Sequence, residues 1–376
     1  MVSRREFVAG ATGAISAAVA PSVAFGQGGG QGRLVFIVQR GAADGLSILA
    51  PVGDRLFRQQ RGALSDAFIG IPTLDGMFAL HPALENLARL YRNGQALLAH
   101  AVALSSPSRL HSEAQHILES GGRRAFDRSD SWTARLAALL PDDPRTSVAM
   151  ISRSTAIDSG VNASCGLPLL AARAHHHWIP DASTTCFVPA LAGVEKLAIA
   201  AGPPEADARR AGTSFGAFVA RRLRSIDGPR IAMVETDGWD THDDQQSRLG
   251  TLLPCLDGMI GAIEAGLGPL WRDTVVVVAT EFGRAIRPNS SGGTDHGAAS
   301  VAILLGGGVR GGRVISDWPG LALPAGGENA GLRGTLELER LLGSAAATSL
   351  GLEPELAMRA MFPAMRAPAV DNLFYG

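Results

Sequence analysis

The sequence predicts an α/β fold in which helices cover both faces of a mostly parallel central sheet. The segments 34–38, 230–234 and 274–279 are short and almost continuously apolar, as expected for strands buried on both faces. Segments with apolar residues at helical spacing, such as 81–92 and 244–265, lie between such strands. This alternation is typical of parallel sheets with helices on both sides.

The remaining elements follow the same rhythm along most of the chain. The other expected strands are 96–104, 147–151 and 300–305, and the other expected helices are 109–120, 131–140, 214–226 and 335–350. Residues 153–212 interrupt the alternation and show few clear elements, which favours a cap or insertion. We therefore expect one α/β domain over residues 33–376 that carries this insertion.

The first 32 residues have the layout of a bacterial export signal. Arg4 and Arg5 precede a weakly apolar run of small residues at 8–25, and a glycine-rich spacer follows at 26–32. This layout is typical of twin-arginine signal peptides and predicts a periplasmic or extracellular protein. The alternative is a cytoplasmic N-terminus with a chance arginine pair. No later stretch has the roughly 18 uninterrupted apolar residues of a membrane span, so none is expected after signal removal.

Charge and cysteine content argue against several classes of function. The chain holds 34 Lys and Arg against 35 Asp and Glu, and no basic run appears, so a nucleic-acid partner is not expected. Cys165, Cys186 and Cys255 form no C-x-x-C motif, which argues against thiol redox catalysis and a zinc ribbon. In an oxidising compartment Cys165 and Cys186 could pair or remain separate.

Acidic and imidazole side chains gather after the predicted strands. Ligands bind beyond the carboxyl ends of the strands in open α/β sheets, so residues found there are the first candidates for chemistry. Carboxylates and imidazoles can hold one or two divalent ions, for which Zn, Ca, Mg and Mn are the candidates. The candidate metal ligands are Asp44, Asp240, His242, Glu281, Asp295 and His296.

A second group of residues suits displacement at phosphorus or sulfur. Such a reaction needs a positioned nucleophile and a cation for the non-bridging oxygens, and a guanidinium fork matches phosphate or sulfate. The candidates are a nucleophile from Ser105, Ser106 or Ser108, an anion-binding group from Arg109 or Arg40, and His111 as general acid or orienting group.

Each candidate also has a purely structural interpretation. Asp44 precedes a glycine and would serve in a turn, and Asp240 would cap the helix expected after it. Glu281 would form a salt bridge with Arg284, and the serines would cap the helix at 109–120. The sequence alone leaves these alternatives open.

Five ordered motifs resemble one family. They are R-G-x-x-D-G-L at 40–46, R-x-H-x-x-A-Q at 109–115, G-W-D-T-H at 238–242, E-F-G-R at 281–284 and G-T-D-H-G at 293–297. Together they resemble the secreted bacterial family called domain of unknown function 1501, a remote relative of the alkaline phosphatase and sulfatase superfamily. The resemblance implies an alkaline phosphatase/sulfatase-like fold, a bound divalent metal and ester hydrolysis. Phe282 departs from the superfamily, which usually has a histidine ligand there, and so departs from a two-metal site.

These observations lead to one main hypothesis and two alternatives. The chain is expected to be an exported metal-dependent hydrolase that acts on a phosphate or sulfate ester of a small molecule, a glycan or a lipid headgroup. A non-catalytic secreted protein, which keeps the fold with a degenerate metal site and binds a protein partner, is the first alternative. A polysaccharide or lipid-headgroup transferase, with the same chemistry, is the second.

Overall fold

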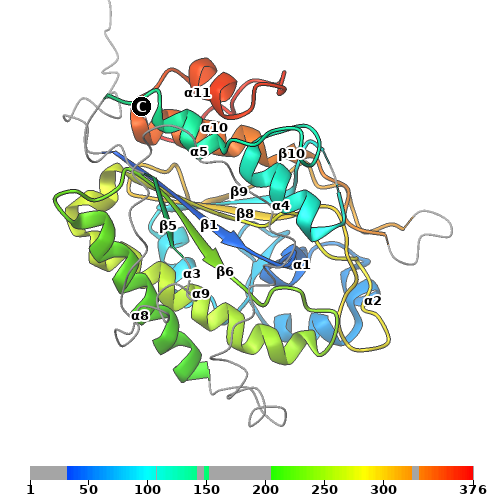
Figure 1. Cartoon of the computed structure of the whole chain (residues 1–376). Coiled ribbons are helices and arrows are strands. Elements are labelled where there is room, and N and C mark those ends of the chain that lie inside the picture. The colour runs from blue at the N-terminus through cyan, green and yellow to red at the C-terminus, as the bar shows by residue number, and fades with distance from the viewer. Residues whose placement is uncertain (1–31, 107, 142–147, 152–204, 324–329, 376) are drawn as a thin grey trace, which may run out of the picture.

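A central eight-stranded sheet organises the computed structural model, which describes residues 32–106, 108–141, 148–151, 205–323 and 330–375 (Figure 1). The strand order is β10-β4-β8-β7-β1-β6-β5, and β9 pairs with β4. The strands are β1 (Arg33–Gln39), β4 (Ala96–Ala103), β5 (Val148–Ile151), β6 (Ile231–Thr236), β7 (Thr274–Ala279), β8 (Ser300–Leu305), β9 (Arg313–Ile315) and β10 (Leu336–Glu337). β8 runs antiparallel to both of its neighbours, and the other pairs are parallel.

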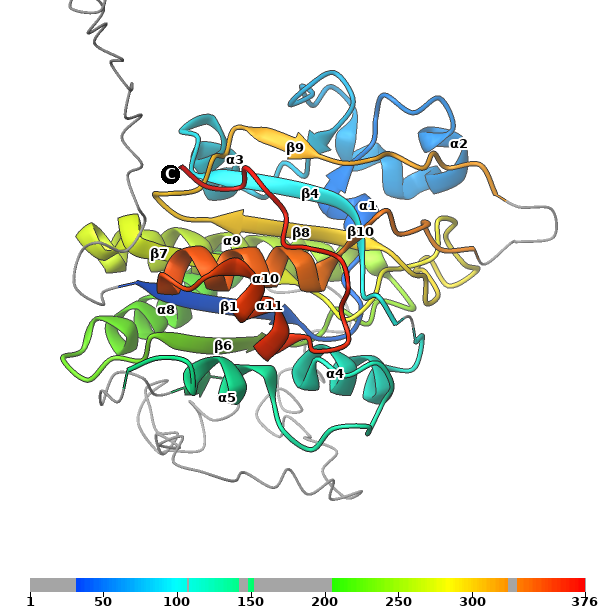
Figure 2. The ribbon, with the colours of Figure 1, turned by 90° about the horizontal axis from the view of Figure 1, so that it is seen from above.

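Helices cover both faces of this sheet. One face carries α3 (Glu85–Arg92), α8 (Glu205–Arg224) and α9 (Gln245–Leu267), and the other carries α4 (His111–Ser120), α5 (Trp132–Ala137), α10 (Leu338–Leu350) and α11 (Pro354–Met361). Figure 2 looks onto the second of these faces, where α10 and α11 lie over the sheet. The predicted α/β class, with a mostly parallel sheet between two helical layers, is confirmed.

The alternation of side chains along β1 explains the two cores. Val35 and Ile37 point into the core with α3, α8 and α9, whereas Leu34, Phe36 and Val38 point into the core with α4, α5, α10 and α11. All five are fully buried. Because successive side chains of a strand face opposite sides, a continuously apolar strand is what two covered faces require.

The sequence missed the short elements and the true start of α8. The unpredicted elements are α1 (Gly45–Ile48), β2 (Leu49–Ala50), α2 (Phe57–Arg61), the 3-10 helices η1 (Gly62–Phe68) and η2 (Gly268–Asp273), β3 (Ala79–Leu80), β9, β10 and α11. α8 already includes Glu205, the first described residue after the gap, whereas the predicted helix starts at 214. A Cβ at Gly212 or Gly216 of α8 would lie 1.8 or 2.3 Å from backbone oxygens of Cys255 and Met259 in α9. These glycines let the two helices pack closely.

Several expectations fall on residues outside the described ranges. These are the export signal and most of its spacer, residues 153–204 of the expected insertion, and Cys165 and Cys186. Among the helices that the structure describes, none is both long enough and apolar enough to span a bilayer.

One edge of the sheet collects the segments that carry the candidate residues. The parallel strands β1, β4, β6 and β7 all end there. β8 is antiparallel, so the loop that precedes it, with Asp295 and His296, also lies at this edge. The direction of β8 therefore brings residues from before a strand together with residues that follow other strands.

Candidate metal centre

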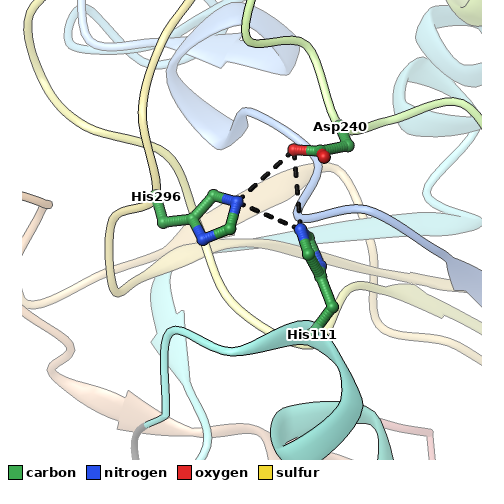
Figure 3. A group of neighbouring side chains, drawn as sticks. All are labelled: His111, Asp240 and His296. Atoms are coloured by element: carbon green, nitrogen blue, oxygen red, sulfur yellow. Dashed lines mark hydrogen bonds and ion pairs between the residues drawn. The ribbon is translucent and has the colours of Figure 1, made fainter.

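Three ligand atoms from distant parts of the chain meet at this edge. They are Nε2 of His111 at the start of α4, Oδ1 of Asp240 after β6, and Nε2 of His296 before β8 (Figure 3). The two nitrogens lie 3.0 Å apart. The Asp240 oxygen lies 3.5 Å from the His111 nitrogen and 3.4 Å from the His296 nitrogen. This trio could hold a metal ion.

The spacing of the trio fits a tetrahedral zinc-type ion. Zinc binds imidazole nitrogen and carboxylate oxygen at about 2.0–2.1 Å, so neighbouring ligands of a tetrahedron lie about 3.3 Å apart. The three separations in the structure run from 3.0 to 3.5 Å. Two imidazoles and one carboxylate suit Zn and similar transition metals better than Ca or Mg, which prefer all-oxygen sites.

His242 adds a fourth donor beside the trio. Its Nε2 lies 2.9 Å from Nε2 of His296 and 3.2 Å from Oδ1 of Asp240. His242 contacts two of the three trio atoms, and no close contact joins it to His111. His111 contacts the same two atoms, at 3.0 and 3.5 Å, so His111 and His242 both flank the Asp240–His296 pair.

Each of the three imidazoles is held from behind by an oxygen acceptor. Nδ1 of His111 lies 2.9 Å from Oε1 of Glu281, and Nδ1 of His242 lies 3.3 Å from Oδ1 of Asp295. Nδ1 of His296 donates to the backbone carbonyl of Arg109 at 2.7 Å. These partners place the proton of each neutral ring on Nδ1 and turn the Nε2 lone pair inward, an arrangement typical of metal-binding histidines.

The inward nitrogens need a positive charge between them. Two neutral rings of this tautomer present only acceptors to each other, and acceptors 2.9–3.0 Å apart repel unless a proton or a cation lies between them. Hydrogen bonds from Asp240 and Glu281 raise the pKa of His111 to about 9, so a proton fills this role in the ion-free protein at neutral pH. Burial lowers the pKa of His296, and the charges of His111 and Arg284 act in the same direction.

Arg284 fixes the carboxylate of the trio. Its side chain is fully buried, and its Nη1 donates to Oδ1 of Asp240 at 2.6 Å. Its other donors bind the backbone carbonyl and the hydroxyl of Thr294. Burial would raise the pKa of Asp240, but the hydrogen bonds from His111 and Arg284 hold it well below its usual range. Asp240 is therefore ionised and already oriented.

The charges around the trio leave room for a divalent cation. With neutral histidines, Asp240, Glu281 and Asp295 contribute three negative charges and Arg284 contributes one positive charge, so -3 + 1 = -2. Asp240 is 46% exposed at its side chain, so the cluster is open to solvent. A buried or half-buried excess of negative charge is costly unless a cation compensates it.

Glu281 lies behind the trio instead of in it. Its side chain is 1% exposed, and its Oε1 accepts from the backbone N–H of Gly41 at 2.9 Å and from Nε2 of Gln115 at 3.1 Å. Thr280 donates to its other oxygen at 2.9 Å. Burial would raise the pKa of Glu281, but hydrogen bonds from His111, the backbone N–H of Gly41 and Gln115 lower it. The carboxylate is thus a fixed acceptor that orients the His111 ring.

The sequence motifs around these side chains match a known family. The family described as "Protein of unknown function (DUF1501)" matches residues 195–329. Residues 195–329 of this chain are thus similar to that family and are called the DUF1501 stretch below. The DUF1501 stretch contains Asp240, His242, Glu281 and the pair Asp295-His296, whereas His111 lies before it. No curated protein matches the sequence.

Solved structures resemble the fold at low sequence identity. A Bacteroides thetaiotaomicron protein from work on the metabolism of multiple glycosaminoglycans is 10% identical, with 92% of this chain and 79% of that chain covered and a TM-score of 0.41. A protein in the alkaline phosphatase superfamily from Vibrio parahaemolyticus is 12% identical, with 92% and 72% covered and a TM-score of 0.41. The C-terminal periplasmic domain of EcEptC from Escherichia coli is 10% identical, with 90% and 88% covered and a TM-score of 0.43.

Asp44, which lies before the DUF1501 stretch, forms hydrogen bonds and an ion pair with residues outside the trio. It caps α1 by accepting from the backbone N–H of Leu46 at 3.1 Å and from the Ser47 hydroxyl at 2.8 Å. It also forms a buried ion pair with Arg61 and accepts from Nε2 of Gln245 at 2.5 Å. The structure therefore places the Asp44 carboxylate in a buried polar network instead of at the trio.

Three of the serine and arginine candidates, Ser105, Ser108 and Arg40, are engaged outside the trio. Ser105 donates to Glu339 at 2.7 Å, and Ser108 donates to Glu113 at 2.8 Å at the start of α4. Arg40 forms ion pairs with glutamates 119 and 235. The side chain of Arg109 is exposed, and its backbone carbonyl accepts a hydrogen bond from Nδ1 of His296.

The ring of Phe282, in the DUF1501 stretch, packs against the rings of His111 and His296. It is 4% exposed, and its ring centre lies 4.9 Å from that of His111 and 5.0 Å from that of His296. A phenyl ring offers no metal ligand, so this side of the trio is closed to a second ion. The packing restricts both imidazoles to the orientations that point Nε2 inward.

Sequence reasoning missed two buried supporting residues of the DUF1501 stretch. The structural alternative for Glu281 was a salt bridge with Arg284, but the structure pairs Arg284 with Asp240. Gln245 gave no signal, because a polar residue at the start of a predicted helix is ordinary. Its burial depends on which loops fold against it, and residue spacing does not reveal that.

Proposed function

We propose that this chain is a metal-dependent hydrolase that uses one zinc-type divalent ion and acts on a phosphate or sulfate ester. His111, Asp240 and His296 would hold the ion, with His242 as the flanking donor. The observation that carries this proposal is the meeting of Nε2 lone pairs whose Nδ1 sides are fixed by Glu281, Asp295 and a backbone carbonyl. A core histidine cluster without a metal function has no need for this arrangement.

The chain's own residues supply the remaining roles. A divalent ion supplies Lewis-acid chemistry at a phosphoryl or sulfuryl oxygen when bound. Arg109 has an exposed side chain and contacts His296 through its backbone carbonyl, so its guanidinium is the candidate group to hold the anionic part of the substrate. Glu281 and Asp295 keep the ligand rings in place. Three protein ligands around one ion leave a position for substrate, as in catalytic sites.

The proposal includes work outside the cytoplasm. The arginine pair at 4–5, the apolar small-residue run and the glycine-rich spacer support twin-arginine export. Replacement of both arginines by lysine in the full chain should keep the protein in the cytoplasm, as measured by cell fractionation. An unchanged distribution would contradict this route.

The first test is metal content. Protein purified from the exported fraction should carry about one equivalent of transition metal by elemental analysis, and chelator treatment should remove it. His111→Ala and His296→Ala should lose the metal, while His81→Ala, away from the trio, should keep it. Metal-free wild-type protein that also fails to bind added Zn, Co or Mn would overturn the proposal.

The second test separates the enzyme from a binding protein. Aryl phosphates and aryl sulfates should be hydrolysed in the presence of the metal, and chelation should abolish the turnover. A metal-loaded protein without turnover, which co-purifies with one secreted partner, would favour the non-catalytic alternative. The hydroxyls of Ser105 and Ser108 donate to Glu339 and Glu113 instead of to residues of the trio, which favours that alternative.

A further inference from the structure

Gln245 is a fully buried amide that contacts both loops carrying Asp240 and His296. It is the first residue of α9, is 0% exposed, and both ends of its side chain form hydrogen bonds. Its carbonyl oxygen accepts from the hydroxyl of Thr241 at 2.9 Å and from that of Thr294 at 2.6 Å. Burial of an amide is favourable only when such partners are present.

The two threonines belong to the two ligand-bearing loops. Thr241 lies between Asp240 and His242 in the loop after β6. Thr294 directly precedes the Asp295-His296 pair in the loop before β8. The backbone N–H of Thr294 also donates to the carbonyl of Thr241 at 3.0 Å. One amide oxygen therefore ties together the loops that supply the carboxylate and the imidazole of the trio.

The nitrogen end of the amide prevents it from turning over. Nε2 of Gln245 donates to Oδ2 of Asp44 at 2.5 Å and to the hydroxyl of Ser47 at 3.2 Å. Asp44 is ionically paired with the buried Arg61, so it can only accept. A flipped amide would place its oxygen against this carboxylate. The Asp44–Arg61 pair thus fixes which end of Gln245 faces the threonines.

Thr294 extends the network to the ligand carboxylate. Its hydroxyl donates to Gln245 and accepts from Nε of Arg284 at 3.3 Å. The same guanidinium donates to Oδ1 of Asp240. Every side chain from Asp44 to Arg284 along this path is buried. A continuous chain of hydrogen bonds therefore runs from Asp44, the N-cap of α1, through Gln245, Thr294 and Arg284 to Asp240.

We propose that Gln245 is a positioning residue, a clamp that holds the loop of Asp240 against the loop of His296. It thereby sets the distance of 3.4 Å between Oδ1 of Asp240 and Nε2 of His296. This inference rests on the proposed metal site. The clamp acts before any ion binds, because its bonds join protein groups only. A variant without these hydrogen bonds keeps Asp240 and His296, but the distance between their ligand atoms should increase. This increase should lower the metal affinity and change the coordination geometry.

Thr294 offers the cleanest test, because isosteric variants exist. Thr294→Val removes the hydroxyl and keeps the shape, Thr294→Ser keeps the hydroxyl, and Gln245→Leu removes the clamp. Zinc affinity by competition with a chromogenic chelator should fall about 10-fold or more in Thr294→Val and Gln245→Leu, as for other groups that orient ligands. Thr294→Ser should stay close to wild type.

The Co(II) absorption spectrum adds a readout that stability alone does not move. The wild-type protein and Thr294→Ser should show the intense visible bands of tetrahedral Co(II), and Thr294→Val should show weaker, shifted bands. Thr213→Val is the matched control, since its hydroxyl binds only the Arg209 carbonyl on α8. If Gln245→Leu does not fold, Thr241→Val replaces it.

The outcomes distinguish the clamp from the site. Folded Thr294→Val and Thr241→Val proteins that bind zinc and cobalt like the wild type overturn the clamp and leave the metal site standing. Wild-type protein that binds neither metal overturns the proposed function itself. Equal losses in Thr294→Ser and Thr294→Val also overturn the clamp, because they would show that the hydroxyl is not what matters.

Discussion

Nε2 of His296 lies 3.0 Å from Nε2 of His111, although the two residues are 185 positions apart in the chain. The far side of each ring is occupied by an oxygen acceptor, which belongs to Glu281 for one ring and to the backbone of Arg109 for the other. When both rings are neutral, two lone pairs therefore face each other over a distance that suits two ligands of one ion. This relationship leads to most of the expectations below.

Removal of a trio histidine should cost more metal affinity than removal of the flanking one. We expect His296→Ala to weaken zinc binding by more than roughly 100-fold, since even groups behind the ligands are typically worth 10–100-fold. His242→Ala should cost about 10-fold, because the His242 ring is more exposed and its partner Asp295 is 37% exposed, whereas His111 is held by the buried Glu281. Competition titrations measure both. Equal losses would place His242 among the primary ligands.

Glu281→Gln should weaken metal binding without unfolding the protein. The glutamine carbonyl can still accept from His111 and the backbone N–H of Gly41, but it no longer carries the charge that makes the ring a strong ligand. We expect a loss of about 10-fold in zinc affinity. Glu264→Gln, on the far part of α9 beside Arg89, is the control. Unchanged affinity in Glu281→Gln would show that the carboxylate does not tune the site.

Gly41→Ala should disturb the site through the backbone of Asp240. Gly41 has a φ of +109°, and a Cβ there would lie 2.4 Å from the backbone nitrogen of Asp240. Gly94→Ala is the matched control, because Gly94 has a φ of +71° with open space around it. We expect about 1–2 kcal/mol of destabilisation for Gly94→Ala from backbone strain alone, and a larger loss for Gly41→Ala.

The free energy of unfolding in chemical denaturation should therefore order the two glycine variants. Gly41→Ala should also reduce metal affinity, whereas Gly94→Ala should not. A Gly41→Ala protein as stable as Gly94→Ala would mean that the loop of Asp240 moves away at no cost.

His100 should make the protein less stable in mild acid. Burial lowers the pKa of this ring to about 4, although the Leu49 carbonyl acts in the opposite direction. Its Nδ1 accepts from the backbone N–H of Ala101, so the folded protein keeps the ring neutral. Between pH 6.5 and 4 the unfolded chain binds a proton that the folded protein does not bind. Its contribution is therefore complete above pH 6.5 and is lost as pH falls, by up to about 1.4 kcal/mol per pH unit.

Denaturation curves at several pH values should show this titration. His100→Gln removes the group, so its unfolding free energy should fall less steeply between pH 6.5 and 4 than that of the wild type. Identical slopes in the two proteins would contradict the buried neutral ring.

Asp44→Asn should act on stability. It leaves the buried guanidinium of Arg61 without its counter-charge, and breaking a buried ion pair on one side typically costs about 3–5 kcal/mol. Asp207→Asn, in an exposed pair with Arg210, should change the unfolding free energy by less than about 1 kcal/mol. If folded Asp44→Asn protein lost its metal at unchanged stability, Asp44 would belong with the ligands instead.

Much of the fold was readable because burial on two faces leaves a strong local signal. The strands at 274–279 and 300–305 have the predicted bounds, since uninterrupted apolar runs between polar turns can hardly be placed elsewhere. The close approach of α8 to α9 at Gly212 and Gly216 was not predicted, because it is a contact between two segments that no local pattern contains. Short elements such as α1 and β10 carry too few residues for a period to appear.

The sequence by itself determined the α/β class, the main strands and which polar residues stand at strand ends. Only the tertiary structure decided which of those residues share one point, because that depends on strand order and on the reversed direction of β8. In the structure His111 lies with Asp240 and His296. Glu281 and Asp295 bind the Nδ1 atoms of two histidine rings. Asp44 binds Arg61 and Gln245 instead. Side chains find hydrogen-bond partners across loops that are far apart in sequence. Residue type therefore predicts what a group can bind, and packing decides what it does bind.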